Sequence, residues 1–282
     1  MNRIIEHIIE KECVLRDFLR NRYTGRRIHF LREKGHILLN GRPVTVAERA
    51  RKGDKLSLIF SEELTFDYPP QDMGLKEIYS DEDVLVVYKP CGVPSMPAAP
   101  HFDGNLFNGL RYLYPEGVFR VVTRLDKDTS GLVLVAKNAL AHSILHEDIR
   151  LICKTYTALV EGELLPCDID APICTGEGAA RYVGEGGKPS KTRIIATKPY
   201  KNYTIASIRT ETGRTHQIRV HLAHVGHPIV GDGLYGSGRA GGQLLACTGI
   251  AFKHPISQKN AEFYIDGEAE ILERLGHVSA KK

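Results

Sequence analysis

The spacing of apolar residues divides the first sixty residues into short helices and strands. Apolar side chains at helical spacing predict a helix over residues 14–19 and a second helix from Ile28 to about Gly35. Short apolar runs at 36–39 and 43–46 predict strands, and the Asn40-Gly41 pair between them is a hairpin signal. A further strand is expected at 56–60. The pattern predicts a compact α/β unit.

The remaining chain mixes continuous apolar runs with alternating and helical patterns. Residues 84–88 and 132–136 are apolar throughout, which is typical of strands buried on both faces. An amphipathic helix is predicted over 138–149. A second helix is expected to begin at a Thr215 cap and run to Val225, with Ile218, Leu222 and Val225 as its buried stripe. Strands are predicted at 154–160 and 203–209, with a long polar loop or insertion at 166–190. The pattern predicts an α+β class.

Charge is distributed unevenly and supports a division into domains. Residues 1–60 carry 14 Lys and Arg against 7 Asp and Glu, whereas the whole 282-residue chain has a net charge of only +4. A basic unit attached to a near-neutral body is typical of nucleic-acid binding, although a solvated basic face gives the same count. We predict a small basic module at 1–62, a linker at 63–75 and a larger domain at 76–282.

Several classes of protein are disfavoured by the composition. No apolar run approaches the roughly 20 residues that span a bilayer, and the first residues lack the pattern of a signal peptide. Six cysteines are scattered without disulfide or metal spacing, which is typical of reduced thiols. We therefore expect a cytoplasmic protein without a membrane segment. A monomer is the default expectation for the oligomeric state.

The segment from Arg124 to Gly131 is the strongest candidate for chemistry. It places Asp126 between the extended run 121–123 and the apolar run 132–136, so a sheet should hold this carboxylate at its rim. Turn-forming residues follow it, and a purely structural role as a turn cap is the alternative. Asp128 lies only two residues away, which leaves a catalytic carboxylate pair as another hypothesis.

Four separated motifs together resemble the RluA-type pseudouridine synthases, which isomerise uridine in RNA. They are an Ile-Tyr-x-Asp segment leading to Lys89-Pro90-x-Gly92, an Arg-Leu-Asp segment, a Lys-x-Tyr-x-Ala segment and a Gly-Arg-Thr-His-Gln-Ile-Arg segment followed by Gly231-Asp232 and Tyr235. The resemblance covers about residues 76–265. It implies a mixed, mainly antiparallel sheet with a central cleft.

The N-terminal unit resembles the small alpha-L RNA-binding module of ribosomal proteins. The matching positions are Leu15, Phe18, Leu31, Gly35, Ile37, Asn40 and Gly41. In such a module Arg22, Arg26, Arg27 and Arg32 would form the face that contacts phosphates, giving an affinity that depends on salt but not on RNA sequence.

The enzyme resemblance assigns a role to individual residues. Asp126 is the catalytic carboxylate, acting either as a nucleophile at C1′ or as a base at C2′ of the ribose, and Arg219 is the cation paired with it. Tyr156 packs against the flipped uracil, and Arg124 helps to hold the nucleotide out of its stack. The other substrate or RNA contacts implied by these motifs are Thr129, Arg214, His216 and Gln217.

The expected reaction needs no cofactor and no metal. Four histidines fall between 216 and 227, but their spacing lacks a carboxylate partner for a zinc site. Two positions depart from the family, because Thr123 and Ala246 stand where histidines are usual. Large-subunit ribosomal RNA is the leading substrate hypothesis and transfer RNA the second. A non-catalytic RNA-binding protein and a glycosidic-bond hydrolase are the alternatives from other classes.

Overall fold

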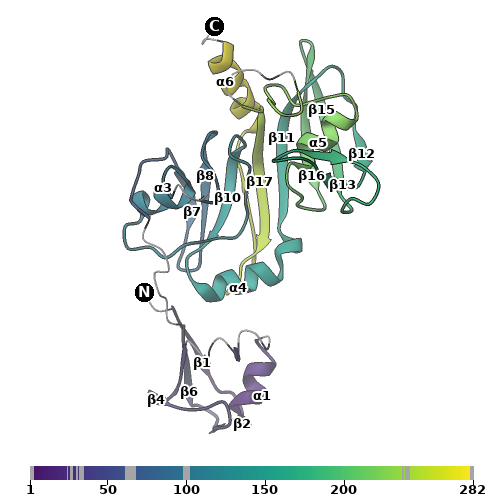
Figure 1. The fold of residues 1–282 in the computed structure, drawn as a ribbon. Helices are drawn as coiled ribbons and strands as arrows, with labels where there is room; N and C mark the ends of the chain where they lie inside the picture. Colours follow the sequence, from purple (N-terminus) through teal and green to yellow (C-terminus); the bar gives the residue numbers. More distant parts are fainter. Residues whose placement is uncertain are drawn as a thin grey trace.

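The structure is a computed structural model that describes residues 3–23, 25, 28–29, 31, 35–60, 68–97, 102–236, 238 and 242–279. It has two parts, a small N-terminal module and a larger domain built on one long sheet (Figure 1). The predicted α+β class with a mainly antiparallel sheet is confirmed. Within the described residues, every helix is too short or too polar to cross a membrane.

The N-terminal module is a four-stranded antiparallel sheet in the order β1-β6-β3-β4, covered by a short helix. Its hairpin is confirmed, because Asn40 and Gly41 both have positive φ, as a tight two-residue turn between strands requires. In place of the strand predicted at 43–46, only Arg42–Pro43 is extended. The elements are β1 Arg3–Ile8, β2 Cys13–Val14, α1 Leu15–Arg20, β3 Gly35–Leu39, β4 Arg42–Pro43, β5 Arg49–Ala50 and β6 Lys55–Phe60.

Strand β1 lay outside the predicted elements. Burial alternates residue by residue along this strand, which is the period of two expected for a strand. The strand pairs with β6 over the whole length of β6. Within the second predicted helix, the described residues Ile28, His29 and Leu31 are helical, and Gly25, which precedes it, is helical as well. The remaining residues of that helix are outside the described part of the chain.

The module is docked on the larger domain. Arg3 donates from Nε and Nη2 to the two carboxylate oxygens of Asp83, at 2.7 and 2.9 Å. Leu140 and Ile144 of the larger domain belong to the same buried apolar cluster as the core of the module. Buried apolar surface and a bidentate ion pair therefore join the two parts.

The larger domain is built on a ten-stranded sheet. Its main path is β12-β15-β16-β11-β17-β10-β8-β7, and β18 and β9 pair with β17 and β10 at its side. All its strand pairs are antiparallel except β10 with β17. The strands are β7 Lys76–Ser80, β8 Val84–Lys89, β9 Arg120–Val121, β10 Ser130–Ala136, β11 Cys153–Glu161, β12 Cys167–Asp170, β15 Lys191–Tyr200, β16 Tyr203–Thr210, β17 Leu245–Lys253 and β18 Asn260–Tyr264.

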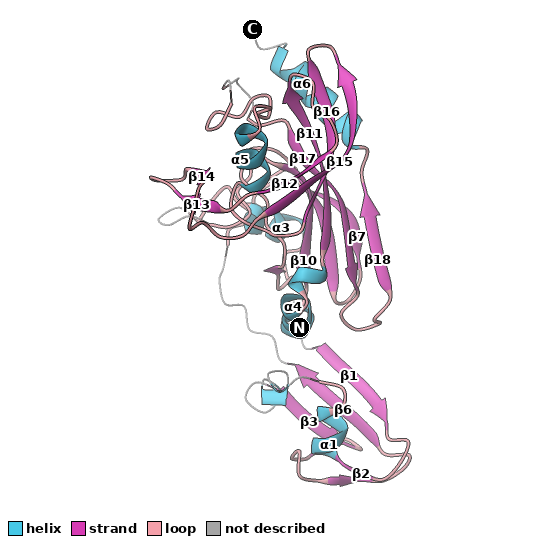
Figure 2. Cartoon of the chain, turned by 90° about the vertical axis from the view of Figure 1, so that its right-hand side faces the viewer, coloured by secondary structure: helices cyan, strands magenta, loops and turns pink. Residues whose placement is uncertain are grey.

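The helices lie on both faces of this sheet, as the side view shows (Figure 2). Along β11, Tyr156 and Ala158 face a cluster that contains Ile218, whereas Leu159 faces one that contains Ile271. Since successive side chains of a strand point to opposite faces, α5 and α6 pack on opposite faces. The helices are α3 Leu106–Leu113, α4 Ala139–Glu147, η1 Ile149–Leu151, α5 Gln217–His224 and α6 Gly267–Ser279.

Three local predictions are wrong. The expected loop at 166–190 contains β12 and a hairpin of β13 Ile173–Thr175 and β14 Arg181–Val183. These short strands lie at an edge or outside the main sheet, so they contain many polar residues. Helix α5 begins at Gln217, with His216 rather than Thr215 as its N-cap residue. Val225 is 38% exposed instead of buried.

The predicted linker is also more ordered than expected in its second half. Tyr68 stacks on Phe107 with ring centroids 4.9 Å apart, and Asn108 donates a hydrogen bond to the Pro69 carbonyl. Residues 68–75 therefore pack on α3 and belong structurally to the larger domain. Residues 61–67 lie outside the described part.

Candidate active site

The turn that carries Asp126 is held by backbone geometry. The Thr129 amide donates to the Asp126 carbonyl at 3.1 Å, which closes the turn before β10. Gly131 follows with φ of +112°, and a Cβ there would lie 2.1 Å from the Cys247 carbonyl oxygen. Glycine is therefore required at this position, where β10 lies directly beside β17. The Asp126 side chain remains 29% exposed and so can be reached from outside.

The segment 89–95 supports this turn. Ser95 Oγ donates to the Leu125 carbonyl at 2.7 Å and accepts from the Leu125 amide at 3.0 Å. Lys89 is fully buried, and its ammonium donates to the carbonyls of Pro90, Val93 and Lys127. Burial lowers the pKa of Lys89 to about 8, so the group is still charged at pH 7. The backbone on both sides of Asp126 is thereby fixed.

Arg219 of α5 joins two carboxylates. Its Nη1 donates to Asp126 Oδ2 at 3.3 Å, and its Nε and Nη2 donate to the two oxygens of Asp232 at 2.7 and 2.8 Å. Burial acts to raise the pKa of Asp232, but hydrogen bonds from Arg219 and from two backbone amides lower it below its usual value. A buried, ionised Asp232 therefore fixes the guanidinium. Its remaining edge faces Asp126.

The sequence-based assignment gave Asp232 and Tyr235 no individual role, but the structure makes both of them functional candidates. Both lie in the fourth motif, Gly231-Asp232-x-x-Tyr235, so their signal was present in the sequence. Arg219 had been assigned a single carboxylate, whereas a buried guanidinium has five donors to satisfy. That unfilled donor capacity is the signal that could have identified Asp232.

His216 lies beside the same carboxylate in a strained conformation. It has φ of +57°, which is uncommon for a residue other than glycine, and it precedes α5 directly. Its Nδ1 is 2.9 Å from Tyr235 Oη, and its Nε2 is 3.9 Å from Asp126 Oδ2. Because the Arg181 amide donates to Tyr235 Oη at 2.8 Å, the hydroxyl proton is free to bond Nδ1 and leave the ring proton on Nε2, facing Asp126. Burial lowers the pKa of His216, which keeps the ring neutral at pH 7.

Tyr156 is buried in β11 on the α5 side of the sheet. Lys154 Nζ lies over its ring, 5.6 Å from the centroid. Burial raises the pKa of Tyr156 to about 12, so its phenol stays protonated at neutral pH. The site thus combines a carboxylate that can be reached from outside, a fixed guanidinium and a neutral aromatic side chain.

The other residues named from the motifs are divided between the surface and the interior. Arg124 and Arg214 are exposed, as contacts with RNA would require. Gln217 is buried and makes four hydrogen bonds, accepting from Thr212 Oγ1 and the Arg214 amide and donating to Lys191 O and Thr192 Oγ1. This uses its full capacity, so Gln217 organises the loop before α5 instead of presenting its amide to RNA.

Thr129 is also buried, and its hydroxyl accepts from Gln243 Nε2 at 3.1 Å. The two positions that depart from the family belong to the scaffold as well. Thr123 Oγ1 accepts from the Leu134 amide at 2.9 Å, and Ala246 is buried in β17 opposite Ser130. Polar bonding and close packing explain these residue types without any contact to substrate.

Asp128 differs from the neighbouring Asp126 in how it is used. Its backbone carbonyl accepts from Cys91 Sγ at 3.2 Å and from Arg274 Nη2 at 3.3 Å. The turn itself is closed by the hydrogen bond from the Thr129 amide to the Asp126 carbonyl. Among the described contacts, Arg219 pairs with the carboxylate of Asp126 and not with that of Asp128.

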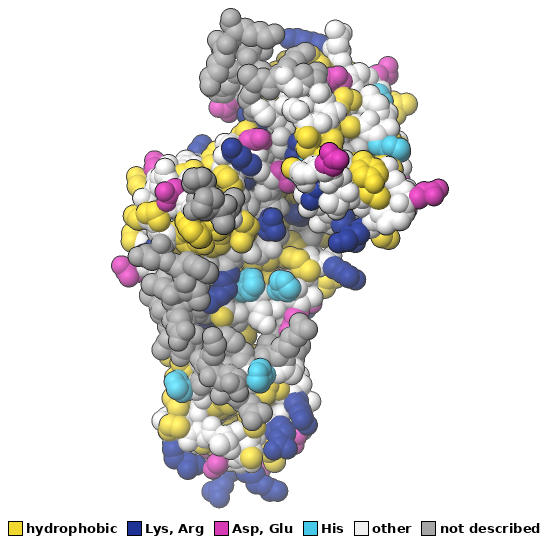
Figure 3. Space-filling model, viewed as in Figure 1, with side chains coloured by type: hydrophobic (Ala, Val, Ile, Leu, Met, Phe, Trp, Pro, Cys, Tyr) yellow, Lys and Arg dark blue, Asp and Glu magenta, His cyan; other side chains and the backbone are white. Residues whose placement is uncertain are grey.

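In the N-terminal module, Arg22 is exposed and its guanidinium lies 3.9 Å from the centroid of the Phe18 ring. Arg26, Arg27 and Arg32 lie outside the described residues. The space-filling view shows Lys and Arg side chains over the middle of one face of the larger domain and at the far end of the module (Figure 3).

One group of side chains in the described residues has the spacing of a metal site, namely Asp81, Asp83 and His254. Its atoms already have partners. His254 Nε2 is 2.9 Å from Asp81 Oδ2, whose second oxygen accepts from two backbone amides, and Asp83 binds Arg3 and Asn138. This group therefore ties strands together and docks the module.

These features define an enzyme of the α+β class, in which a single carboxylate, paired with a buried arginine, is presented at the rim of a large mixed sheet. Comparison with known proteins identifies the class further. Residues 83–224 match the family model of RNA pseudouridylate synthases. The chain belongs to this family, whose members are isomerases that convert uridine to pseudouridine in RNA.

The relatives extend the match beyond those residues. An uncharacterised RNA pseudouridine synthase of Bacillus subtilis, YjbO, is 37% identical over 82% of this chain and 86% of its own length. The ribosomal large subunit pseudouridine synthase D of Haemophilus ducreyi is 32% identical over 90% of this chain and 86% of its own length. The solved human RNA pseudouridylate synthase domain-containing protein 1 superposes with a TM-score of 0.58 at 28% identity, over 70% of this chain and 85% of that one.

Proposed function

We propose that this pseudouridine synthase modifies a uridine of large-subunit ribosomal RNA in the cytoplasm, with Asp126 as its catalytic carboxylate. The observation that carries the role of Asp126 is the shared guanidinium of Arg219. Asp232 neutralises one edge of that group while fully buried, and Asp126 takes the other edge while 29% exposed. A carboxylate that is held by a cation and can still be reached from outside is what attack on a ribose needs.

The chemistry follows from the positions of these residues. The N-glycosidic bond of the uridine breaks, the uracil turns, and a bond forms between its C5 and C1′. C5 loses its proton to solvent, and N1, released from C1′, takes up one proton from solvent. Asp126 acts either as the nucleophile at C1′ or as the base at C2′, and Arg219 holds its negative charge in place. Tyr156, as a neutral aromatic, offers a face for the uracil, and exposed Arg124 can occupy the gap that the nucleotide leaves.

The choice of RNA rests on the relatives. Proteins of Haemophilus ducreyi and Pseudomonas aeruginosa that are named ribosomal large subunit pseudouridine synthase D are 32% and 38% identical to this chain. Exposed arginines in the N-terminal module support a second contact with structured RNA outside the Asp126 site. Transfer RNA is the alternative substrate.

Pseudouridine mapping of ribosomal and transfer RNA tests both parts of the proposal. Cells lacking the gene are complemented with the wild-type chain or with Asp126→Asn. A large-subunit position that is lost on deletion and restored only by the wild type supports the RNA and the residue together. A position in transfer RNA would overturn the ribosomal assignment, and restoration by Asp126→Asn would overturn the role of Asp126.

A further inference from the structure

The C-terminal helix α6 packs against the sheet on the face away from α5. Ile271 is fully buried in a cluster with Leu159 and Leu244, and partly buried Leu272 and Leu275 pack on the same cluster. The helix begins very close to the sheet, because a Cβ on Gly267 would lie 2.1 Å from Thr157 Oγ1. The helix is therefore held at its start by close packing and along its length by apolar burial.

One polar side chain of this helix reaches the Asp126 turn from behind. Arg274 Nη1 donates to Ser130 Oγ at 2.9 Å and to the Leu245 carbonyl at 3.1 Å. Its Nη2 donates to the Gln243 carbonyl at 2.8 Å and to the Asp128 carbonyl at 3.3 Å. One turn earlier, Glu270 accepts from the Ser130 hydroxyl at 2.6 Å and from Tyr88 Oη at 2.8 Å.

The groups that Arg274 contacts belong to two different segments. Asp128 lies in the turn that carries Asp126, and Ser130 begins β10 directly after it, whereas Gln243 lies just before β17 and Leu245 begins that strand. The β17 side is tied to the loop that carries Asp232, since the Leu244 amide donates to the Val230 carbonyl at 2.8 Å. Asp232 in turn positions Arg219. Arg274 thus links the segment that holds the carboxylate to the segment that orients its cation.

We propose that Arg274 is a positioning residue for catalysis, and that it sets the alignment of the Asp126 turn with the Arg219–Asp232 pair from the opposite face of the sheet. The inference rests on the proposed role of Asp126. A planar guanidinium with donors in a fixed fork can hold four acceptors in two segments, whereas the point charge of lysine cannot. Arg274 reaches the turn from the face of the sheet away from α5, so we expect its effect to act through the geometry of the turn.

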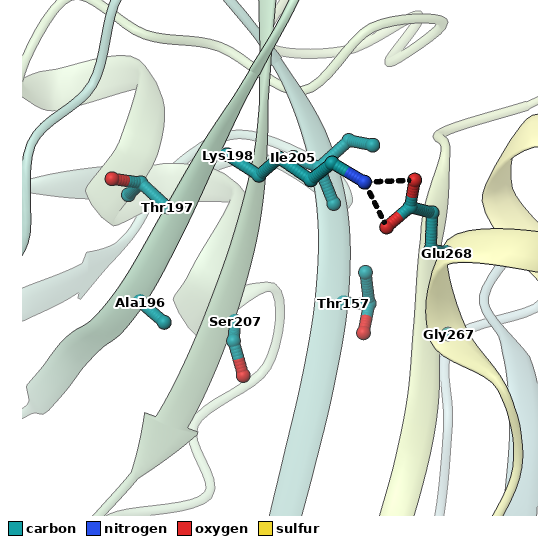
Figure 4. A pocket seen from close by; sticks show the side chains of 8 residues that line it. All are labelled: Thr157, Ala196, Thr197, Lys198, Ile205, Ser207, Gly267 and Glu268. Carbon is teal, nitrogen blue, oxygen red and sulfur yellow. Dashed lines mark hydrogen bonds and ion pairs between the residues drawn. The ribbon is translucent and has the colours of Figure 1, made fainter.

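The test compares Arg274→Lys with Glu268→Gln in the full-length protein. Glu268 is also in α6, but it pairs with exposed Lys198 beside a pocket that is lined by none of the residues of the turn (Figure 4). It therefore controls for general loosening of the helix. Hydrogen exchange of the peptide 124–131 is measured against that of 217–224, together with RNA affinity, thermal unfolding and the single-turnover rate of pseudouridine formation on total RNA from deletion cells.

Arg274→Lys should accelerate exchange in 124–131 but not in 217–224, and it should slow the single-turnover rate by about 10-fold with little change in RNA affinity. Glu268→Gln should leave both the exchange in 124–131 and the single-turnover rate unchanged. Ser130→Ala removes one acceptor of Arg274, together with the hydroxyl that donates to Glu270, and keeps every residue of the helix. It should give the same pattern at about 3-fold, so the test survives if Arg274→Lys folds poorly.

Unchanged exchange in 124–131 would overturn the anchoring. Faster exchange with a wild-type rate would overturn the positioning role. These failures are distinct from failure of the proposed function, in which Asp126→Asn would match the wild type or no RNA would be converted by either. The exchange measurement decides the anchoring even then, because it needs no substrate.

Discussion

Arginine serves both regions of this molecule, but in opposite environments. Arg219 in the larger domain is 7% exposed and donates three hydrogen bonds to two carboxylates. Arg22 in the N-terminal module is exposed and lies over the ring of Phe18. A buried, paired charge is barely screened by salt and can hold a reacting group in place, whereas an exposed charge gives an affinity that salt weakens.

The two regions should therefore respond to different perturbations. Changes at the Asp126 site should alter the rate or the stability with little effect on the salt dependence of RNA binding. Changes on the module should alter the salt dependence and leave the chemistry intact.

The largest effect is expected for Asp126→Asn. The amide keeps the volume of the side chain but can act neither as a nucleophile nor as a base, so the single-turnover rate should fall by at least about 1,000-fold. RNA affinity, measured by filter binding at several salt concentrations, should stay within about 3-fold of the wild type, since the loss is confined to chemistry. Persistent turnover would show that another group performs the reaction.

Asp232→Asn should be the most destabilising substitution. It leaves the buried Arg219 guanidinium without its bidentate partner, which should cost about 4 kcal/mol of unfolding free energy. Urea unfolding at pH 7 measures this, with Glu211→Gln as control, because the exposed pair of Glu211 with Arg193 should contribute only about 0.5 kcal/mol. Equal losses in the two variants would remove the distinction between buried and exposed charge.

The pH dependence gives the same comparison a second test. The pKa of Asp232 in the folded chain is below its ordinary value of 3.8, so its contribution is fully present above pH 3.8 and disappears as the pH falls below that value. Stability of the wild type should therefore decline in this acid range, and that decline should be shallower in Asp232→Asn. An equally steep decline of stability at low pH in the wild type and in Asp232→Asn would contradict the lowered pKa of Asp232.

The module should show a moderate effect that depends on salt. Replacing exposed Arg16, Arg20 and Arg22 by Gln should weaken RNA binding about 10-fold at low salt and reduce the slope of log affinity against log salt by about 0.7 to 0.9 for each phosphate that the module no longer neutralises. The single-turnover rate at saturating enzyme should not change. Lys198→Gln, on the far face of the sheet, is the matched control, and an equal change in its slope would assign RNA binding elsewhere.

The smallest effect is expected for Asp128→Asn. The described hydrogen bonds of Asp128 are accepted by its backbone carbonyl, which the substitution preserves. Activity should stay within about 3-fold of the wild type, in line with a change away from buried networks. A loss comparable to that of Asp126→Asn would revive the two-carboxylate hypothesis.

The local pattern of the sequence determined the elements whose burial repeats regularly. The apolar runs at 84–88 and 132–136 became β8 and β10, the 138–149 stripe became α4, and Asn40-Gly41 formed its hairpin. Asp126 could be located because turn residues separate it from a buried strand. In each case the residue types reflect an environment that repeats over a few neighbouring positions.

The tertiary structure alone decided which polar groups meet. Ser95 and Arg274 are brought to the Asp126 turn from segments 30 or more residues away in the chain, and Asp232 is joined to Asp126 through Arg219. These partners follow from the order of strands in the sheet. In the same topology the Gln217 side chain is buried, and the polar stretch at 166–190 forms the edge strand β12 and the separate β13-β14 hairpin. Hydrogen-bond partners of buried polar groups depend on topology, and no local period encodes them.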